Sequence, residues 1–176
     1  MKAMLSSNTN EYSTPQWLFD ELDCIFHFDV DVCATKNNAK CNVFYTKEQD
    51  GLLQNWYGNV WCNPPYSKEE KACKLNCKKK KCLTRGHILE DEPGEKAWWR
   101  KAWLGYIGKN FNTVLLVKSK TGSSWQQEFL WKMQPKIVTD FRFDLKDIEV
   151  MFIPGRLKFN GESAPFESMI VSYQCK

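Results

Sequence analysis

Apolar positions near the start of the chain follow first a helical and then a strand-like spacing. Thr14 can cap a helix and Pro15 fits its first position, and large apolar residues then recur every three or four positions up to residue 26. Residues 26–32 alternate Phe and Val with His and Asp, which is the period of a strand with one buried face. The pattern predicts a helix that leads directly into a strand.

The rest of the chain continues to alternate between the two patterns. Residues 35–59 predict irregular structure with turns at Asp50-Gly51 and Gly58-Asn59. The pattern then predicts, in order, a strand at 60–62, a helix from Glu95, a strand at 113–117 and a helix from Ser123 or Ser124 to Pro135. Four further segments, 136–143, 150–153, 156–160 and 168–175, are typical of strands joined by turns. This order predicts an α/β fold with a mainly parallel sheet and an antiparallel end.

Composition narrows the class of protein. The 176 residues suffice for one domain with a core, and the apolar fraction of 43% with 11 Phe and 8 Trp argues against an intrinsically disordered chain. We find no internal repeat, so a single domain over residues 1–176 is predicted. No apolar run approaches the roughly 18 residues of a membrane span, and the N-terminus has no sustained apolar segment. We therefore expect a cytoplasmic protein without a membrane partner, in which the 8 cysteines serve as metal ligands or core residues.

Positive charge is concentrated in one segment. Residues 68–85 contain eight Lys and Arg against two Glu, a net charge of +6, whereas the whole chain carries only +4. The rest of the chain is therefore slightly acidic. A basic cluster on a nearly neutral body indicates a polyanion-binding element, although a solvated lysine-rich loop explains the charge equally well.

The tetrad Asn63-Pro64-Pro65-Tyr66 directly follows the predicted strand 60–62. Ligands of open α/β sheets bind beyond the carboxyl ends of the strands. An asparagine oxygen and a carbonyl held in a rigid Pro-Pro unit are two acceptors suited to the two hydrogens of an exocyclic amine, and a tyrosine ring can stack on a flat heterocycle. The tetrad therefore predicts a site that binds the amino group of a planar base through hydrogen bonds. We favour this interpretation over a proline-rich turn with a packed tyrosine.

The tetrad also matches the catalytic motif of amino-group methyltransferases that use S-adenosylmethionine, and the wider sequence resembles the phage-type DNA N6-adenine methyltransferase (Dam-like) family. The resemblance is carried by "EYSTPQWLFDEL", "FDVDVCATKNNAKC", "QDGLLQNWYGNVWCNPPYS", "VLLVKSKTGSSW" and "GRLKFNGESAPFESMIV". It implies a reduced Rossmann-like S-adenosylmethionine-dependent methyltransferase fold with a Cys-rich insertion. It further implies methyl transfer to an adenine flipped out of double-stranded DNA, in the cytoplasm of a bacterial or phage-infected cell.

The resemblance also implies which residues form the site. The residues expected to contact the cofactor are Tyr12, Ser13, Thr14, Pro15, Asp31, Cys33, Ala34, Asp50 and Asn63, and those expected to hold the adenine are Asn63, Pro64, Pro65 and Tyr66. Two of these residues have structural alternatives, because Thr14 can cap a helix and Asp50 can start a turn. Asp31 is harder to explain structurally, since a carboxylate at the end of an inner strand needs a partner, and the ammonium of the cofactor would serve. Many methyltransferases have a Gly-rich loop where this chain has "DVCATKNN".

Cys73, Cys77, Cys82 and His87 lie within fifteen residues of one another. Four such ligands suit a structural tetrahedral Zn²⁺ site, and the neighbouring lysines favour thiolates. The segment 68–94 has few apolar residues, so bound metal could supply its folding energy, whereas a flexible basic loop with free thiols is the alternative. The residues of this segment predicted to contact DNA are Lys78, Lys79, Lys80, Lys81 and Arg85.

Two other functions fit part of the pattern. An RNA or protein-glutamine methyltransferase would use the same Asn-Pro-Pro-Tyr motif, and a non-catalytic zinc-dependent nucleic-acid-binding protein would use the basic segment alone. The basic segment favours nucleic acid over protein, and only the resemblance favours DNA over RNA. Asn63 and Tyr66 argue against a purely binding protein, because binding alone does not require them. No obligate protein partner is expected.

Overall fold

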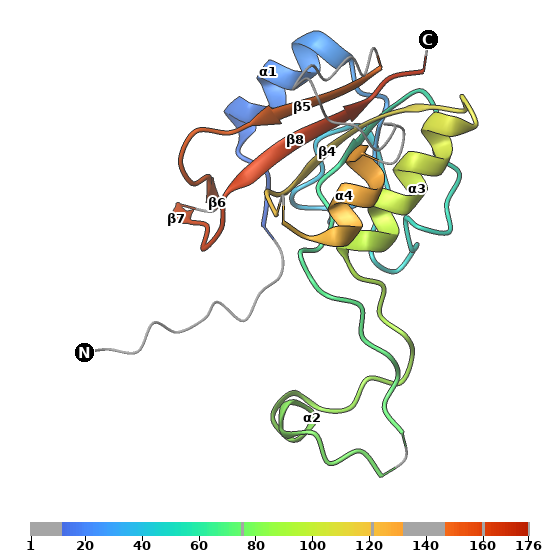
Figure 1. Ribbon diagram of the computed structural model, residues 1–176, viewed down its shortest axis with the longest axis vertical. Helices are drawn as coiled ribbons and strands as arrows, with labels where there is room; N and C mark the ends of the chain where they lie inside the picture. The colour runs from blue at the N-terminus through green and yellow to red at the C-terminus, as the bar shows by residue number, and fades with distance from the viewer. Residues whose placement is uncertain (1–11, 75, 121, 132–146, 160, 176) are drawn as a thin grey trace.

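The computed structural model describes residues 12–74, 76–120, 122–131, 147–159 and 161–175, and its centre is a six-stranded mixed sheet (Figure 1). The strands run in the order β2-β1-β3-β4-β8-β5. Their bounds are β1 (Val30–Asp31), β2 (Val43–Phe44), β3 (Asn59–Cys62), β4 (Asn112–Lys118), β5 (Ile148–Phe152) and β8 (Ser168–Tyr173). A separate hairpin consists of β6 (Lys158–Phe159) and β7 (Glu162–Ser163). The helices are α1 (Gln16–Phe26), α2 (Lys80–Arg85), α3 (Glu95–Ile107) and α4 (Ser124–Trp131).

The sheet has a parallel half and an antiparallel end. Strands β2, β1, β3 and β4 are parallel to one another, whereas β8 pairs antiparallel with both β4 and β5. The five inner residues of β4 are all buried, as expected for a central strand that is covered on both faces. The prediction of a mixed α/β fold with a mainly parallel sheet and an antiparallel end is confirmed.

Helices cover both faces of the sheet, and successive residues of β4 face opposite layers. Leu115 and Val117 belong to the core under α3 and α4, together with Trp98, Trp99 and Phe129. Val114 and Leu116 belong to the core under α1, which also includes Leu18, Phe19, Leu22, Trp61, Tyr66 and Phe159. The aromatic side chains therefore fill a three-layer arrangement, and Tyr66 of the tetrad lies on the α1 side.

The strand order reverses between β1 and β3. From β1 the chain moves to β2 on one side, and it then returns to form β3 on the other side of β1. The Val32 N–H donates to the Trp61 carbonyl oxygen at 3.1 Å, so the ends of β1 and β3 are adjacent. Such a reversal is where open α/β sheets bind their ligands, beyond the carboxyl ends of the strands. The segments after Asp31 and after Cys62 meet at this point.

Near the N-terminus, the predicted end of the first helix at Phe26 is confirmed, whereas its predicted cap and the predicted bounds of the following strand were wrong. The N-cap of α1 is Pro15 rather than Thr14, and no side chain caps this helix. Phe26 belongs to α1 rather than to a strand, because His27 adopts a left-handed conformation with φ of 51° and ends the helix. The Asp23 carboxylate accepts the Phe28 N–H at 2.7 Å, which holds the chain in this exit. The strand predicted over residues 26–32 is consequently limited to β1.

Other predicted elements are close to the observed ones. The predicted strands at 60–62 and 113–117 correspond to β3 and β4, and the two predicted later helices correspond to α3 and α4. The segment 156–160 contains β6, which pairs with β7 rather than with the sheet. Residues 136–143 and Pro135 lie outside the described residues. Within the described residues, no helix has both the length and the apolar character needed to cross a membrane.

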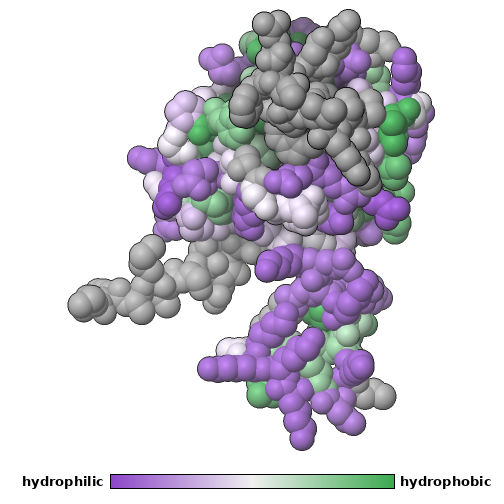
Figure 2. All heavy atoms as spheres, viewed as in Figure 1, coloured by the Kyte–Doolittle hydropathy of each residue, from purple (hydrophilic) through white to green (hydrophobic). Residues whose placement is uncertain are grey.

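Residues 68–94, which we call the arm, leave the body between β3 and α3 and carry α2 at their far end (Figure 1). The two sides of the arm are joined by paired backbone hydrogen bonds between Glu70 and Glu92 at 3.0 and 2.8 Å. At its base, a Cβ atom on Gly94 would lie 2.3 Å from the Glu69 backbone nitrogen, so only glycine fits there. Figure 2 shows that hydrophilic side chains cover most of the arm.

Candidate active site

The side chain of Asn63 is held in one orientation at the end of β3. Its Nδ2 donates to the Tyr12 carbonyl oxygen at 2.6 Å and to Thr14 Oγ1 at 3.0 Å. A backbone carbonyl can only accept, so the nitrogen of the amide must face Tyr12. The Oδ1 atom is therefore turned away from the N-terminal segment and is available as an acceptor.

The Tyr66 hydroxyl lies between two acceptors. It is 2.9 Å from Asn63 Oδ1 and 3.2 Å from the Leu116 carbonyl oxygen, and its single proton serves one of them at a time. Oδ1 can accept two hydrogen bonds, so it retains capacity for a further donor. Among the described residues, no donor contacts the Pro64 carbonyl oxygen. The tetrad thus offers two acceptors one residue apart, on a backbone with locked φ angles.

The ring of Tyr66 is packed rather than open. Tyr66 is only 6% exposed. Its ring centroid lies 5.0 Å from the ring centroid of Phe166 and 5.4 Å from that of Tyr12. The Lys118 ammonium lies 5.2 Å from the same centroid. Burial raises the pKa of Tyr66 well above its usual value, so the hydroxyl stays a neutral donor. A base that stacks on Tyr66 must take the place of one of these neighbours.

Asp31 lies at the end of β1 with its carboxylate almost fully buried. The residue is 2% exposed, and burial raises its pKa to about 6, although the two backbone N–H groups that it accepts partly oppose this shift. Those donors are Cys33 N at 3.2 Å and Lys40 N at 3.1 Å. A carboxylate has about four acceptor positions, so two remain for a ligand. The carboxylate also fixes the loop that follows β1.

Asp50 starts a tight turn that presses against the end of β1. It has a φ of 51°, and its Oδ1 accepts the Leu52 N–H at 3.0 Å. A Cβ atom on Gly51 would lie 2.0 Å from the Val32 carbonyl oxygen, so this close approach requires glycine. Asp50 therefore starts a turn, which was the structural alternative to a role in cofactor binding. The same turn places Asp50 near the end of β1, where the cofactor is expected.

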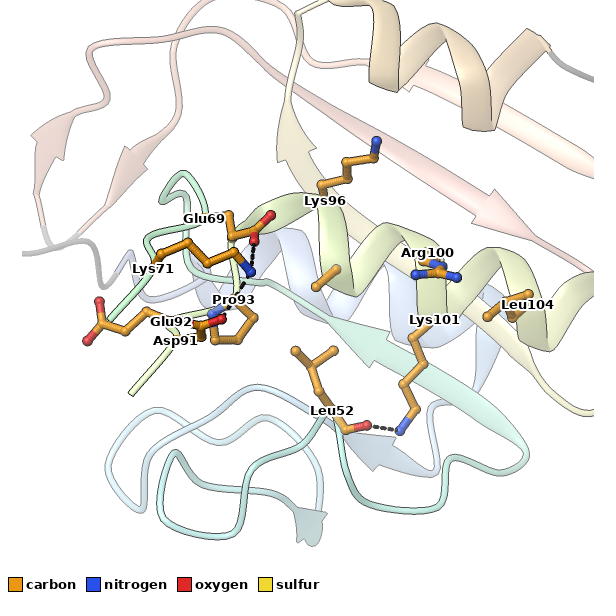
Figure 3. Close-up of a pocket in the computed structure, with 12 residues that line it drawn as sticks. Leu52, Glu69, Lys71, Asp91, Glu92, Pro93, Lys96, Arg100, Lys101 and Leu104 are labelled. Carbon is orange, nitrogen blue, oxygen red and sulfur yellow. Dashed lines mark hydrogen bonds and ion pairs between the residues drawn. The ribbon is translucent and has the colours of Figure 1, made fainter. Parts of the chain in front are cut away.

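A pocket of about 690 Å³ lies beside the base of the arm (Figure 3). Its walls are the turn around Leu52, both sides of the arm and the outer face of α3. Lys71 forms ion pairs there with Glu69 at 2.6 Å and Asp91 at 3.0 Å. None of the residues predicted to hold the cofactor or the base lines this pocket. It is thus separate from the tetrad and from Asp31.

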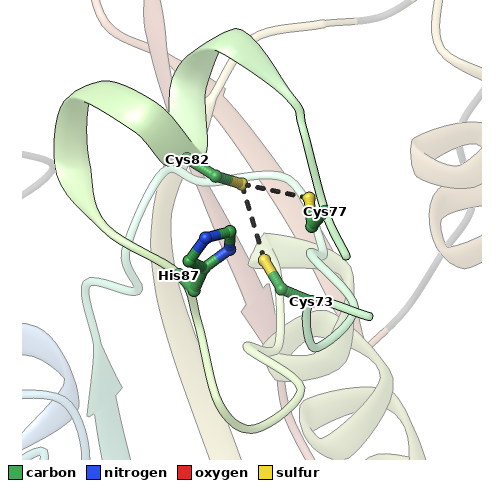
Figure 4. Close-up of side chains that lie close together, drawn as sticks. All are labelled: Cys73, Cys77, Cys82 and His87. Atoms are coloured by element: carbon green, nitrogen blue, oxygen red, sulfur yellow. Dashed lines mark hydrogen bonds between the residues drawn. The ribbon is translucent and has the colours of Figure 1, made fainter. Parts of the chain in front are cut away.

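The four predicted metal ligands converge in the arm (Figure 4). The ligand atoms of Cys73, Cys77, Cys82 and His87 all lie within 4.8 Å of one another. Cys82 Sγ is 3.5 Å from Cys73 Sγ and 3.6 Å from Cys77 Sγ. A tetrahedral site with Zn–S bonds of about 2.3 Å separates its sulfurs by about 3.8 Å, so the observed spacing fits zinc. These thiols are free, and the separations are too long for disulfide bonds.

Basic residues are interleaved with the predicted metal ligands along the chain. Lys78, Lys79 and Lys80 are exposed, and Lys81 is exposed but pairs with Glu70 at 2.8 Å. Arg85 is the last residue of α2. The pKa of the Cys77 thiol is lowered, mainly by a hydrogen bond from the backbone of Lys79. The arm therefore presents its lysines to solvent around a compact set of thiols.

Comparison with known proteins identifies the family. A family model described as DNA N-6-adenine-methyltransferase (Dam) matches residues 2–171. The chain belongs to the Dam family. A curated relative, the DNA N-6-adenine-methyltransferase of Escherichia phage T1, is 28% identical over 95 residues, which cover 52% of this chain and 40% of the relative. The match thus spans less than half the length of that relative. No solved structure matches the chain.

In this Dam-family chain, the predicted site residues form two groups. Tyr12 and Thr14 contact Asn63 directly, whereas Cys33 contacts Asp31 through its backbone. Ala34 follows in the same loop, where its N–H donates to the Tyr45 carbonyl oxygen at 3.0 Å. Ser13 and Pro15 are half-buried beside Thr14. The two groups lie at the ends of β3 and β1, respectively.

Two further residues bear on the chemistry of this Dam-family site. Cys62 immediately precedes the tetrad, is fully buried, and has a thiol pKa that burial raises well above its usual value. It faces the core under α3 and is unsuited to act as a nucleophile. Lys118 donates from Nζ to the Tyr66 carbonyl oxygen at 2.9 Å, and it was not predicted from the sequence. Its only signal was a lysine directly after the buried run 113–117.

Proposed function

We propose that this protein is a DNA adenine N6-methyltransferase that uses S-adenosylmethionine and acts on an adenine flipped out of double-stranded DNA. Membership of the Dam family supports this function. The observation that carries it is the orientation of Asn63, whose nitrogen is engaged by Tyr12 and Thr14 so that its oxygen is left to accept. An amide locked in this way is suited to hold an N–H donor.

The tetrad explains how an adenine amine is made reactive. Asn63 Oδ1 and the Pro64 carbonyl oxygen accept the two N6 hydrogens, which favours tetrahedral geometry at N6 and directs its lone pair out of the ring plane. When bound, S-adenosylmethionine would supply the electrophilic methyl group for direct in-line transfer. The N6–C bond would form as the S–C bond breaks, with S-adenosylhomocysteine as the leaving group and the surplus N6 proton lost to solvent. No enzyme nucleophile is needed, which agrees with the buried state of Cys62. Positioning and hydrogen bonding provide the catalysis.

The target base must leave the duplex to reach these acceptors. The N6 amine is paired and stacked inside DNA, so in-line attack requires base flipping. Stacking on an aromatic side chain returns about 1–3 kcal/mol per base, and Tyr66 is the ring of the tetrad that can provide it. Because Phe166 and Tyr12 now pack against Tyr66, entry of the base is coupled to a shift of these rings.

The cofactor is best accommodated at the end of β1. We interpret the fold as a reduced Rossmann-like methyltransferase, because the sheet order reverses between the strands that carry Asp31 and Asn63. The Asp31 carboxylate has acceptor capacity left for the cofactor's ammonium, and such a partner would offset the burial of its charge. Ser13, Thr14, Pro15, Cys33 and Ala34 would form the adjoining walls, with Asp50 near the adenosine.

We interpret the arm as an insertion into a single domain of residues 1–176. Zn²⁺ held by Cys73, Cys77, Cys82 and His87 would order a segment that has little apolar surface to bury. The exposed lysines from Lys78 to Lys81, with Arg85, would then contact DNA phosphates from the far end of the arm (Figure 1). The substrate places the reaction in the cytoplasm of a bacterial or phage-infected cell, and the chain needs no protein partner for it.

The test is methyl transfer with identification of the product. The purified chain is incubated with labelled S-adenosylmethionine and, in parallel, with unmethylated duplex DNA, RNA of the same sequence or a glutamine-containing protein substrate. The proposal predicts label in DNA that is recovered as N6-methyladenine after digestion to nucleosides. Label confined to RNA or to protein would contradict the proposal and favour one of the related methyltransferase activities.

A further inference from the structure

Lys118 links the last strand of the parallel half to the catalytic tetrad. It is the final residue of β4, which pairs with β3 through the register Cys62–Leu115. From there its Nζ reaches the Tyr66 carbonyl oxygen at 2.9 Å. The ammonium also lies 5.2 Å from the Tyr66 ring centroid and 4.6 Å from that of Phe166. One side chain thus contacts both the backbone and the ring of the last residue of the tetrad.

The ammonium of Lys118 is partly buried and fixed by its contacts, unlike that of a solvated surface lysine. The residue is half-buried, and burial lowers the pKa of its ammonium, while the Glu95 carboxylate opposes this shift and Lys120 adds to it. Glu95 is the first residue of α3 and is only 5% exposed. The ammonium is therefore held by two aromatic rings and a backbone carbonyl rather than by water alone.

The tetrad is anchored differently at its two ends. At one end, Asn63 is oriented by Tyr12 and Thr14, which belong to the segment before α1. At the other end, Lys118 holds the Tyr66 carbonyl oxygen. The Pro64 carbonyl lies between these anchors on a backbone of restricted φ. Its position relative to Asn63 Oδ1 therefore depends on both ends being fixed.

We propose that Lys118 is a positioning residue for methyl transfer, which sets the geometry of the Pro64 acceptor by holding Tyr66 from β4. The inference rests on the proposed function, since it concerns the same acceptor pair. Lys118 holds Tyr66, which is not among the residues expected to contact the cofactor. Its loss should therefore affect the turnover of bound substrate more than the binding of S-adenosylmethionine.

The test compares Lys118→Met with wild type in kcat for DNA methylation and in the Kd for S-adenosylmethionine. Small misplacements of reacting groups lower rates by up to about a hundredfold, so kcat should fall by about ten- to a hundredfold while Kd stays within about twofold. Lys118→Arg should recover much of the rate, because a guanidinium can both donate to the carbonyl and stack on the rings. Thermal unfolding shows whether each variant is folded.

Lys101→Met is a matched control. The Lys101 ammonium likewise lies 4.9 Å from a ring centroid, that of Trp56, and donates to a backbone carbonyl, that of Leu52, at 2.7 Å. It anchors the turn after Asp50 instead of the tetrad, so its loss should weaken cofactor binding or lower the Tm without a selective fall in kcat. A similar selective fall in both variants would overturn the proposal.

Two other results would also overturn the inference. One is a Lys118→Met enzyme with kcat within twofold of wild type. The other is a loss of kcat and of cofactor affinity together, with no recovery in Lys118→Arg, because that pattern reflects general destabilisation. A wild-type chain that binds S-adenosylmethionine but methylates no substrate would refute the proposed function itself, which separates the two failures.

Discussion

Replacement of Cys77 by Ser tests whether the cluster in the arm is a zinc site. The sulfurs of Cys73 and Cys77 lie 3.5 and 3.6 Å from that of Cys82, close to the separation of about 3.8 Å in a tetrahedral zinc site. Structural zinc sites bind with about 10–16 kcal/mol, or about 2.5–4 kcal/mol for each of four ligands. Loss of one ligand should therefore weaken the affinity by roughly a hundredfold or more.

The assay measures zinc per chain after gel filtration in the presence of a weak chelator. Wild type should retain about one equivalent, and Cys77→Ser should retain almost none. The matched control is Cys24→Ser, which removes an exposed thiol on α1, outside the cluster. The main thermal transition should be preserved in both variants, since the sheet core lies outside the arm.

Equal zinc content in Cys77→Ser and wild type would refute the assignment of this ligand set. A wild-type chain that holds no zinc after purification with added metal would refute the site as a whole. The second result would make the arm a basic segment with free thiols.

Two further predictions concern the cofactor and the DNA. Burial raises the pKa of Asp31 to about 6. Isothermal titration should therefore show that S-adenosylmethionine binds more tightly as the pH rises from about 5 to about 7 and the carboxylate ionises. Asp31→Asn should bind the cofactor weakly, with little dependence on pH. Since this pKa is raised, the contribution of Asp31 to stability is complete below pH 3.8 and is lost as the pH rises through about 6. Chemical denaturation should show that Asp31→Asn removes this loss of stability. An unchanged dependence of the free energy of unfolding on pH in Asp31→Asn would contradict the assignment. The double variant Lys78→Gln/Lys79→Gln should reduce the slope of log K for DNA binding against log salt concentration by about 0.9 for each phosphate that the arm no longer neutralises. The control Lys47→Gln/Lys109→Gln makes the same change in charge at two exposed lysines outside the arm and should leave this slope unchanged.

Much of the fold could be predicted because its elements follow clear periodicities. β4 is a continuous apolar run, and α3 places Trp98, Trp99 and Ala102 on a buried face. β2 could not be predicted, because it has two residues and neither is buried. That short strand is what makes the sheet order reverse beside β1. The feature that best locates the ligand site was therefore hidden at the level of sequence.

The candidate site was predictable where one motif carries it, but not where distant segments meet. The tetrad stands out in the sequence as four specific residues after a strand. The partners of Asn63 are a backbone carbonyl at Tyr12 and a hydroxyl at Thr14, about fifty residues away. A carbonyl leaves no signal in a sequence, and Thr14 was interpreted as a possible helix cap. Lys118 was missed because its role depends on which strand lies beside β3.

The most direct test of the account is to compare wild type with Asn63→Ala for methyl transfer to unmethylated duplex DNA, with cofactor binding measured on the same samples. We predict N6-methyladenine with wild type and none with Asn63→Ala. The affinity for S-adenosylmethionine should be largely unchanged, because Asn63 Oδ1 holds the amine of the base whereas Asp31 is the proposed partner of the cofactor's ammonium. Comparable methylation by Asn63→Ala would contradict the central claim that this amide grips the adenine.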